Sequence, residues 1–142
     1  MLHFEFTEEQ QQFRKILRDF AREELLPNYM KWDREGITPR HLWPKMGELG
    51  ITGLRIPEAY GGVGADCVTT GIAAEELGKG DFNLTYAVML NGLIGEILTQ
   101  HASESLKQQW LPQIASGHKI VGIAITEPSA GTDAGGIKST AV

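Results

Sequence analysis

The sequence predicts an all-α fold in which a multi-helix domain is followed by the first strand and a glycine-rich loop of a truncated β-domain. Three observations predict it. Apolar residues recur at helical spacing through most of the first 118 positions, capping residues flank these stretches, and a short β-type run follows Lys119. We therefore expect a helical domain over residues 1–118 and the start of a β-domain over residues 119–142.

The first helix is expected over residues 7–26. Thr7 and Gln10 have the spacing of a capping box, and acidic residues occupy the first turn, where the helix dipole favours them. Pro27 is expected to end this helix or to restart it. The apolar positions of the segment share one helical face: Phe13, Ile16, Leu17, Phe20 and Ala21.

Two short helical segments are expected next. The first contains Trp32 and is closed by Gly36. The second starts with Thr38 as N-cap and Pro39 at its first helical position, and Gly50 supplies its C-cap. The glycine-rich connection at residues 54–64 is expected to serve only the topology.

A helix over residues 67–78 carries two adjacent carboxylates. Neighbouring residues on a helix point in different directions, so Glu75 and Glu76 are not expected to form an acid/base pair. We predict that both lie on a solvated helix face. Cys67, the single cysteine, is predicted to be a small buried apolar side chain.

The following helix is predicted to be the buried centre of the domain. Asp81 or Asn83 can cap it, it extends to about Gln100, and its apolar residues leave little polar face.

The last helix is expected to begin after Ser103 and to end at Gly117. Pro112 is expected to kink it or to split off a final turn. Its apolar face is predicted to consist of Leu106, Trp110, Ile114 and Ala115.

Composition excludes several classes of function. The 142 residues include 13 Lys+Arg and 18 Asp+Glu, a net charge of −5, with no basic stripe, so no nucleic-acid partner is expected. The apolar stretch at residues 84–98 is interrupted by Asn91 and Glu96, which argues against a membrane span. A single cysteine and an N-terminus without a secretory pattern predict a cytoplasmic location. No metal site is expected from the scattered histidines, which are His3, His41, His101 and His118.

A loop rich in glycine and small hydroxyl residues follows the β-type run at residues 120–125. It has neither a P-loop nor a dinucleotide motif, and the chain contains no GxSxG nucleophile motif. Small residues such as Ala130 and Gly131 allow close approach of the backbone to a ligand. Amide groups there, with the hydroxyls of Thr126 and Thr132, can donate to phosphates or ring carbonyls. A plain strand-connecting turn is the alternative.

Three segments, in order, resemble the acyl-CoA dehydrogenase family: residues 6–10 (FTEEQ), 56–64 (IPEAYGGVG) and 124–133 (AITEPSAGTD). The third matches the family pattern at every position: small, aliphatic, Thr/Ser, Glu, two variable positions, small, Gly, Ser/Thr, Asp. A further small residue, Gly136, follows it. The helix at residues 106–117 agrees as well, so the resemblance covers the whole chain.

The resemblance implies a flavoenzyme with an N-terminal helical domain, a middle β-domain and a C-terminal helical bundle, using FAD as cofactor. In that family a glutamate removes the α-proton of an acyl-CoA thioester, the β-hydrogen leaves as hydride to flavin N5, and a trans-2-enoyl-CoA forms. The resemblance also implies electron transfer to an electron-transferring flavoprotein and a homo-oligomer, a dimer or tetramer, for the full-length enzyme.

Positions carried across from the family's motif give the expected site. The cofactor contacts would be Ile123, Ala124, Ile125, Thr126, Gly131 and Thr132. Thr132 is also expected to reach the substrate, and Met89 and Leu93 to line the acyl chain. The family's catalytic base lies in the C-terminal bundle, so none is expected here, and Glu127 is expected to be structural. We therefore expect the chain alone neither to hold FAD tightly nor to oxidise acyl-CoA.

Two alternatives stay open on the sequence. Flavin monooxygenases and nitroalkane-oxidising enzymes resemble the same family and would be distinguished at the position of the base. A free-standing helical interaction module, with a partner docked on the helix at residues 84–98, would be a different class of protein.

Overall fold

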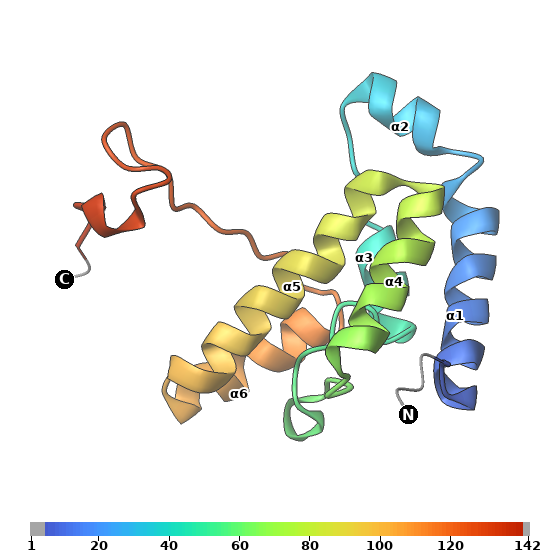
Figure 1. Cartoon of the computed structure of the whole chain (residues 1–142), viewed down its shortest axis with the longest axis horizontal. Helices are drawn as coiled ribbons and strands as arrows, with labels where there is room; N and C mark the ends of the chain where they lie inside the picture. The colour runs from blue at the N-terminus through green and yellow to red at the C-terminus, as the bar shows by residue number, and fades with distance from the viewer. Residues whose placement is uncertain (1–4, 141–142) are drawn as a thin grey trace.

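The computed structural model describes residues 5–140 and contains six α-helices and no strand within that range (Figure 1). The all-α prediction is confirmed. Figure 1 shows α4 between α1 and α5, with α6 crossing α5 and the C-terminal segment extending away from the helices. The helices are α1 (Glu8–Phe20), α2 (Tyr29–Glu35), α3 (Leu42–Glu48), α4 (Cys67–Gly80), α5 (Phe82–His101) and α6 (Glu104–Ala115). Three short segments are the π-helix η1 (Ala21–Leu25) and the 3-10 helices η2 (Glu58–Tyr60) and η3 (Ala134–Gly136).

The capping box predicted at the start of α1 is confirmed. The Thr7 hydroxyl accepts the Gln10 amide at 3.1 Å, and the Gln10 side-chain oxygen accepts the Thr7 amide at 3.1 Å. The predicted helix at residues 7–26 is continuous to Leu25, but its last turn is the π-helix η1, in which the Leu26 amide donates to the Ala21 carbonyl. Pro27 lies in the turn before α2, where the chain restarts as a helix.

The second short helix starts later than predicted. Gly36 closes α2 with a φ of 63°, as expected, but Thr38 does not cap the next helix. Instead the Leu42 amide donates to the Pro39 carbonyl in an isolated turn, and α3 begins at Leu42. The proline is suited to a turn as well as to a first helical position, which explains the error. Gly50, with a φ of 75°, follows the end of α3 as predicted.

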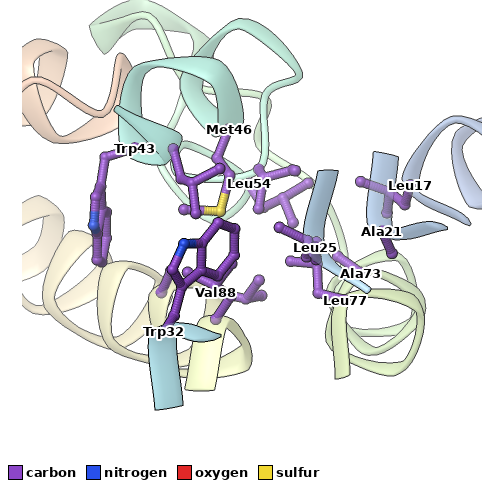
Figure 2. Close-up of a cluster of buried hydrophobic side chains, with 14 residues drawn as sticks. Leu17, Ala21, Leu25, Trp32, Trp43, Met46, Leu54, Ala73, Leu77 and Val88 are labelled. Carbon is purple, nitrogen blue, oxygen red and sulfur yellow. The ribbon is translucent and has the colours of Figure 1, made fainter. Parts of the chain in front are cut away.

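The main core lies where α1, α3, α4 and α5 meet (Figure 2). Figure 2 shows the Trp32 side chain directed toward Met46 and Leu54, which ties α2 into the core. The buried residues of this cluster are Leu17, Ala21, Leu25, Trp32, Leu42, Trp43, Met46, Ile51, Leu54, Ala73, Leu77, Leu84, Ala87 and Val88.

A buried carboxylate joins α1 to α4. Glu76 is 1% exposed, and its carboxylate accepts from Arg14 at 2.6 Å, Arg18 at 3.0 Å and Lys79 at 3.0 Å. Hydrogen bonding from Arg18 is the main cause that lowers the pKa of Glu76 to about 2, in spite of burial. The predicted solvated face is therefore wrong for Glu76, because its arginine partners lie on another helix. Glu75, which contacts Arg14 and Lys79, is half exposed as predicted.

α5 is buried on one face only. Asp81 caps it, since its carboxylate accepts the Asn83 amide at 2.9 Å. The buried face consists of Leu84, Thr85, Ala87, Val88, Asn91 and Gly95. The opposite face exposes an apolar row that we call the α5 stripe: Phe82, Tyr86, Met89, Leu93 and Ile97. The prediction of a helix buried all round is wrong, because no part of the described chain covers this face.

α6 is continuous through Pro112, so the predicted split of a final turn is wrong. Pro112 is exposed, and the helical carbonyl that loses its amide partner there can be solvated. Ser103 caps the helix as predicted. Leu106 and Trp110 are 43% and 37% exposed, which corrects the predicted apolar face. The buried side belongs to a second cluster of Ile56, Leu111, Ile114 and Ala115.

The end of α6 touches the backbone of α3. Gly117 has a φ of 72°, and a side chain there would overlap the Trp43 carbonyl. A side chain at Gly47 would likewise overlap the Ser116 carbonyl. Arg40 donates to the His118 carbonyl at 2.9 Å on the same side. These contacts fix the point at which the chain leaves the helical domain.

Other expectations concern cysteine and histidine. Cys67 is exposed in the first turn of α4, so its predicted burial is wrong. His41, His101 and His118 are exposed, and His3 lies outside the described residues.

Within residues 5–140, no group of three or more His, Cys, Asp or Glu side chains is arranged to hold a metal ion. Over the same range, no helix combines the length and apolar character needed to cross a bilayer.

Candidate functional site

The β-type run at residues 120–125 connects the helical domain to the candidate loop, but it forms no strand. A strand requires a neighbour to pair with, and no described segment pairs with this one, which is why the strand prediction fails here. Val121 packs against the second apolar cluster. Ile123 and Ile125 are 44% and 46% exposed.

The loop at residues 126–139 begins with a tight turn. The Glu127 amide donates to the Ala130 carbonyl at 2.8 Å, and the Ala130 amide returns a hydrogen bond to the Glu127 carbonyl at 3.2 Å. Pro128 and Ser129 are the central residues, and proline at the first central position favours such a turn. This pair of bonds brings the two ends of the turn together.

The remainder of the loop folds over Ala130. This side chain is only 4% exposed, although the loop stands away from the helices (Figure 1). The 3-10 helix η3 passes close by, since a side-chain carbon at Gly136 would lie 3.6 Å from that of Ala130. From the sequence, Ala130 was expected only to be a small residue that lets a ligand approach. In the structure its side chain is buried at the centre of the loop.

The Glu127 side chain closes the loop. Its two carboxylate oxygens accept the amides of Lys138 and Ser139, each at 2.9 Å. Hydrogen bonding from the Ser139 side chain is the main cause that lowers the pKa of Glu127, and the two amides act in the same direction. The carboxylate is therefore ionised at neutral pH and turned inward. This arrangement supports the expectation that Glu127 is structural.

The predicted cofactor residues lie on the exposed side of this segment. Ile123, Ala124, Ile125, Thr126, Gly131 and Thr132 are all exposed. Thr126 and Gly131 come together across the turn, because a side-chain carbon at Gly131 would lie 3.9 Å from the Thr126 methyl. Among the described residues, no acceptor bonds the amides of Gly131 and Thr132. The loop can therefore offer two amide donors and threonine hydroxyls to a ligand.

Met89 and Leu93, the predicted acyl-chain residues, lie on the α5 stripe and not in the loop. They are 58% and 47% exposed. Figure 1 shows the loop extending away from α5, so the structure does not bring these two groups of predicted residues together.

The exposure of the α5 stripe can be tested by replacing leucine with alanine once on the stripe and once on the buried face of α5. Leu93→Ala is expected to change the free energy of unfolding by less than about 1 kcal/mol, whereas Leu84→Ala, on the buried face, should lower it by about 3 kcal/mol. Urea denaturation of the 142-residue chain measures both. Equal losses would show that the stripe is covered in solution.

The sequence analysis missed a surface pocket of about 530 Å³ between α1, the 54–64 connection and the start of α4. Val63, an apolar residue between glycines, is one sign of it in the sequence. The pocket is lined by Thr7, Glu9, Gln10, Phe13, Leu49, Leu54, Val63, Ala65, Asp66 and Thr69.

Solved structures of one class of enzyme share the arrangement of helices described above. A glutaryl-coenzyme A dehydrogenase in complex with glutaryl-CoA matches with a TM-score of 0.90 and 32% identity, covering 96% of this chain and 35% of that chain. An acyl-CoA dehydrogenase from Geobacillus kaustophilus matches with a TM-score of 0.87 and 36% identity, covering 96% and 36%. The fold is thus that of the helical N-terminal part of acyl-CoA dehydrogenases.

Sequence comparison agrees with the fold. The family described as acyl-CoA dehydrogenase, N-terminal domain, matches residues 7–118, so the chain belongs to the acyl-CoA dehydrogenase family. A probable acyl-CoA dehydrogenase of Bacillus subtilis (strain 168), YngJ, is 40% identical over 99% of this chain and 37% of its own length. An acryloyl-CoA reductase (NADH) of Anaerotignum propionicum is 33% identical over 99% and 36%. The chain thus spans little more than a third of these relatives.

Proposed function

We propose that this chain forms the N-terminal helical domain and the flavin-contacting loop of an FAD-dependent acyl-CoA dehydrogenase, which converts an acyl-CoA thioester to a trans-2-enoyl-CoA. The observation that carries the proposal is the loop at residues 126–139. It follows a helical domain of this family and presents the amides of Gly131 and Thr132 without an intrachain acceptor in the described chain. Such amides can bind a pyrophosphate without a basic side chain.

The chemistry of the segment fits a flavin nucleotide. FAD, when bound, would supply the acceptor for the hydride that leaves the substrate. Ile123 and Ile125 present exposed apolar side chains suited to a flat ring, and Thr126 presents a hydroxyl. Gly131 has no side chain to obstruct a ligand. The Glu127 carboxylate is turned onto two amides, so it does not stand free to repel a phosphate.

The proposal extends to substrate and partners. Met89 and Leu93 would line the acyl chain and Thr132 would reach the CoA arm. The base that removes the α-proton would come from outside residues 1–142. Electrons would pass to an electron-transferring flavoprotein, and the whole enzyme would be a dimer or tetramer. In support, one solved neighbour contains glutaryl-CoA, and another comes from work on the electron transferring flavoprotein of Acidaminococcus fermentans. We also propose a cytoplasmic location.

The 142-residue chain alone is expected to purify without stoichiometric flavin, because residues 5–140 offer FAD an exposed loop and no surface that encloses it. The check is absorbance near 450 nm, a property of the cofactor, after incubation with FAD and gel filtration. A yellow 142-residue chain would contradict this prediction.

The test of the function itself uses the natural reading frame that contains this chain. That protein should carry flavin, and acyl-CoA should bleach the absorbance near 450 nm in the absence of oxygen. A flavin-free protein, or a flavin that acyl-CoA does not reduce but nitroalkanes do, would overturn the proposal.

A further inference from the structure

We propose that Glu127 is a positioning residue, whose carboxylate holds the returning backbone at residues 138–139 and thereby sets the place of the ligand-facing amides of Gly131 and Thr132. The inference rests on the proposed function of the loop, and it assigns a positioning role to a side chain whose carboxylate accepts two backbone amides.

The Glu127 carboxylate closes the loop by holding two points of the returning backbone. The hydrogen bonds at 2.9 Å from Lys138 and Ser139 end on different oxygens of one carboxylate, so both oxygens are used. The backbone of Glu127 is held at the same time by its two bonds to Ala130. One residue therefore fixes both the start of the loop and its return, with Gly131 and Thr132 between these two points.

Within residues 5–140, no other side chain takes the place of this carboxylate. The helical domain does not support this loop, which extends away from it in Figure 1. The backbone bonds of η3 are local: the Gly136 amide donates to the Asp133 carbonyl at 3.1 Å, and the Ile137 amide donates to the Ala134 carbonyl at 3.5 Å. Among the described residues, no other side chain bonds the backbone at residues 137–139. Among residues 5–140, the Glu127 carboxylate is therefore the only hydrogen-bond acceptor for the amides of Lys138 and Ser139.

The two bonds need the chemistry of a carboxylate. An ionised carboxylate that accepts two amides forms charge-assisted hydrogen bonds, which are stronger than neutral ones. Glutamine offers one oxygen and turns an NH2 group toward the second amide, so it can satisfy only one of the two. Aspartate retains both oxygens but is one methylene shorter. The site therefore requires glutamate in particular.

The first measurement examines the loop alone, in the 142-residue chain. In Glu127→Gln, hydrogen exchange of the Lys138 and Ser139 amides should become about tenfold faster, while the capping-box amide of Gln10 stays unchanged. Glu58→Gln is the matched control, because Glu58 is exposed in the other glycine-rich loop. Unchanged exchange at Lys138 and Ser139 would overturn the inference.

The second measurement uses the FAD-loaded protein from the natural reading frame. Glu127→Gln should weaken FAD binding or raise the KM for acyl-CoA by about tenfold, with the melting temperature of the helices and the Glu58→Gln control unchanged. Faster exchange with unchanged FAD affinity and KM would show that the contact is only structural, and would overturn the inference. If the wild-type protein binds no flavin, the proposed function fails and the inference fails with it. This result differs from a loss of flavin binding in Glu127→Gln alone, because the wild-type protein then still binds flavin.

Discussion

Replacing Glu76 with glutamine is expected to lower the free energy of unfolding by about 3 kcal/mol at neutral pH. The pKa of Glu76 falls from 4.5 to about 2 in the folded chain, and each pKa unit corresponds to about 1.36 kcal/mol. The conversion applies because the side chain is fully buried. Urea denaturation followed by circular dichroism measures the loss.

The matched control is the neighbouring carboxylate. Glu75 also contacts Arg14 and Lys79, but its side chain is 49% exposed, so Glu75→Gln should cost less than about 1 kcal/mol. Similar losses in the two variants would contradict the burial of Glu76, and a stable Glu76→Gln variant would contradict the network between α1 and α4.

Acid should erase the difference between wild type and Glu76→Gln. A carboxylate whose pKa is lowered on folding stabilises the fold above its unfolded pKa, here 4.5, and loses this effect as the pH falls toward about 2. Glu75 and Glu104 also have lowered pKa values, mainly through hydrogen bonds from Lys79 and Gln108, and add acid sensitivity of their own. The difference between the two proteins therefore isolates Glu76, and a difference that is constant from pH 7 to pH 2 would contradict its assigned pKa.

Gly117→Ala is expected to be more damaging still, with a loss of more than about 4 kcal/mol or no folded protein. The residue has a φ of 72°, which disfavours any side chain, and the new methyl group would also overlap the Trp43 carbonyl of α3. The α3–α6 contact would have to open. Soluble yield and thermal melting give the result.

Gly36→Ala separates the cost of a positive φ from the cost of steric overlap with a neighbouring helix. Gly36 has a similar φ of 63°, but a side-chain carbon there meets nothing within 4 Å. This variant should fold and lose only about 1 kcal/mol, the cost of the backbone conformation. If Gly117→Ala folds and loses no more than Gly36→Ala, the close approach of α6 to α3 does not exist in solution.

Local signals could be read from the sequence because their partners lie within a few residues. The Thr7–Gln10 capping box, the Ser103 cap and the Asp81 cap each involve residues two or three positions apart, and all three are confirmed. Gly36 and Gly50, the glycines that end α2 and α3, could be predicted for the same reason. Their role depends only on the positive φ of the residue itself, which glycine adopts readily.

Features that depend on distant partners could not be predicted. The burial of Glu76 follows from Arg14 and Arg18, some sixty residues earlier in the chain. The exposure of the α5 stripe depends on which face α4 covers, which the apolar composition of a helix does not tell. The loop residues were placed by resemblance to the family's motif, whereas the inward turn of Glu127 onto Lys138 and Ser139 needed coordinates.

The backbone contact at Gly117 also limits where the loop can travel. Gly117, His118 and Val121 each contact the helical domain, so the last anchored residue before the loop is Val121. The five residues from Gly122 to Thr126, fully extended, cover only about 17 Å. Any displacement of the loop relative to the helices is therefore limited by the reach of these five residues from Val121, about 17 Å.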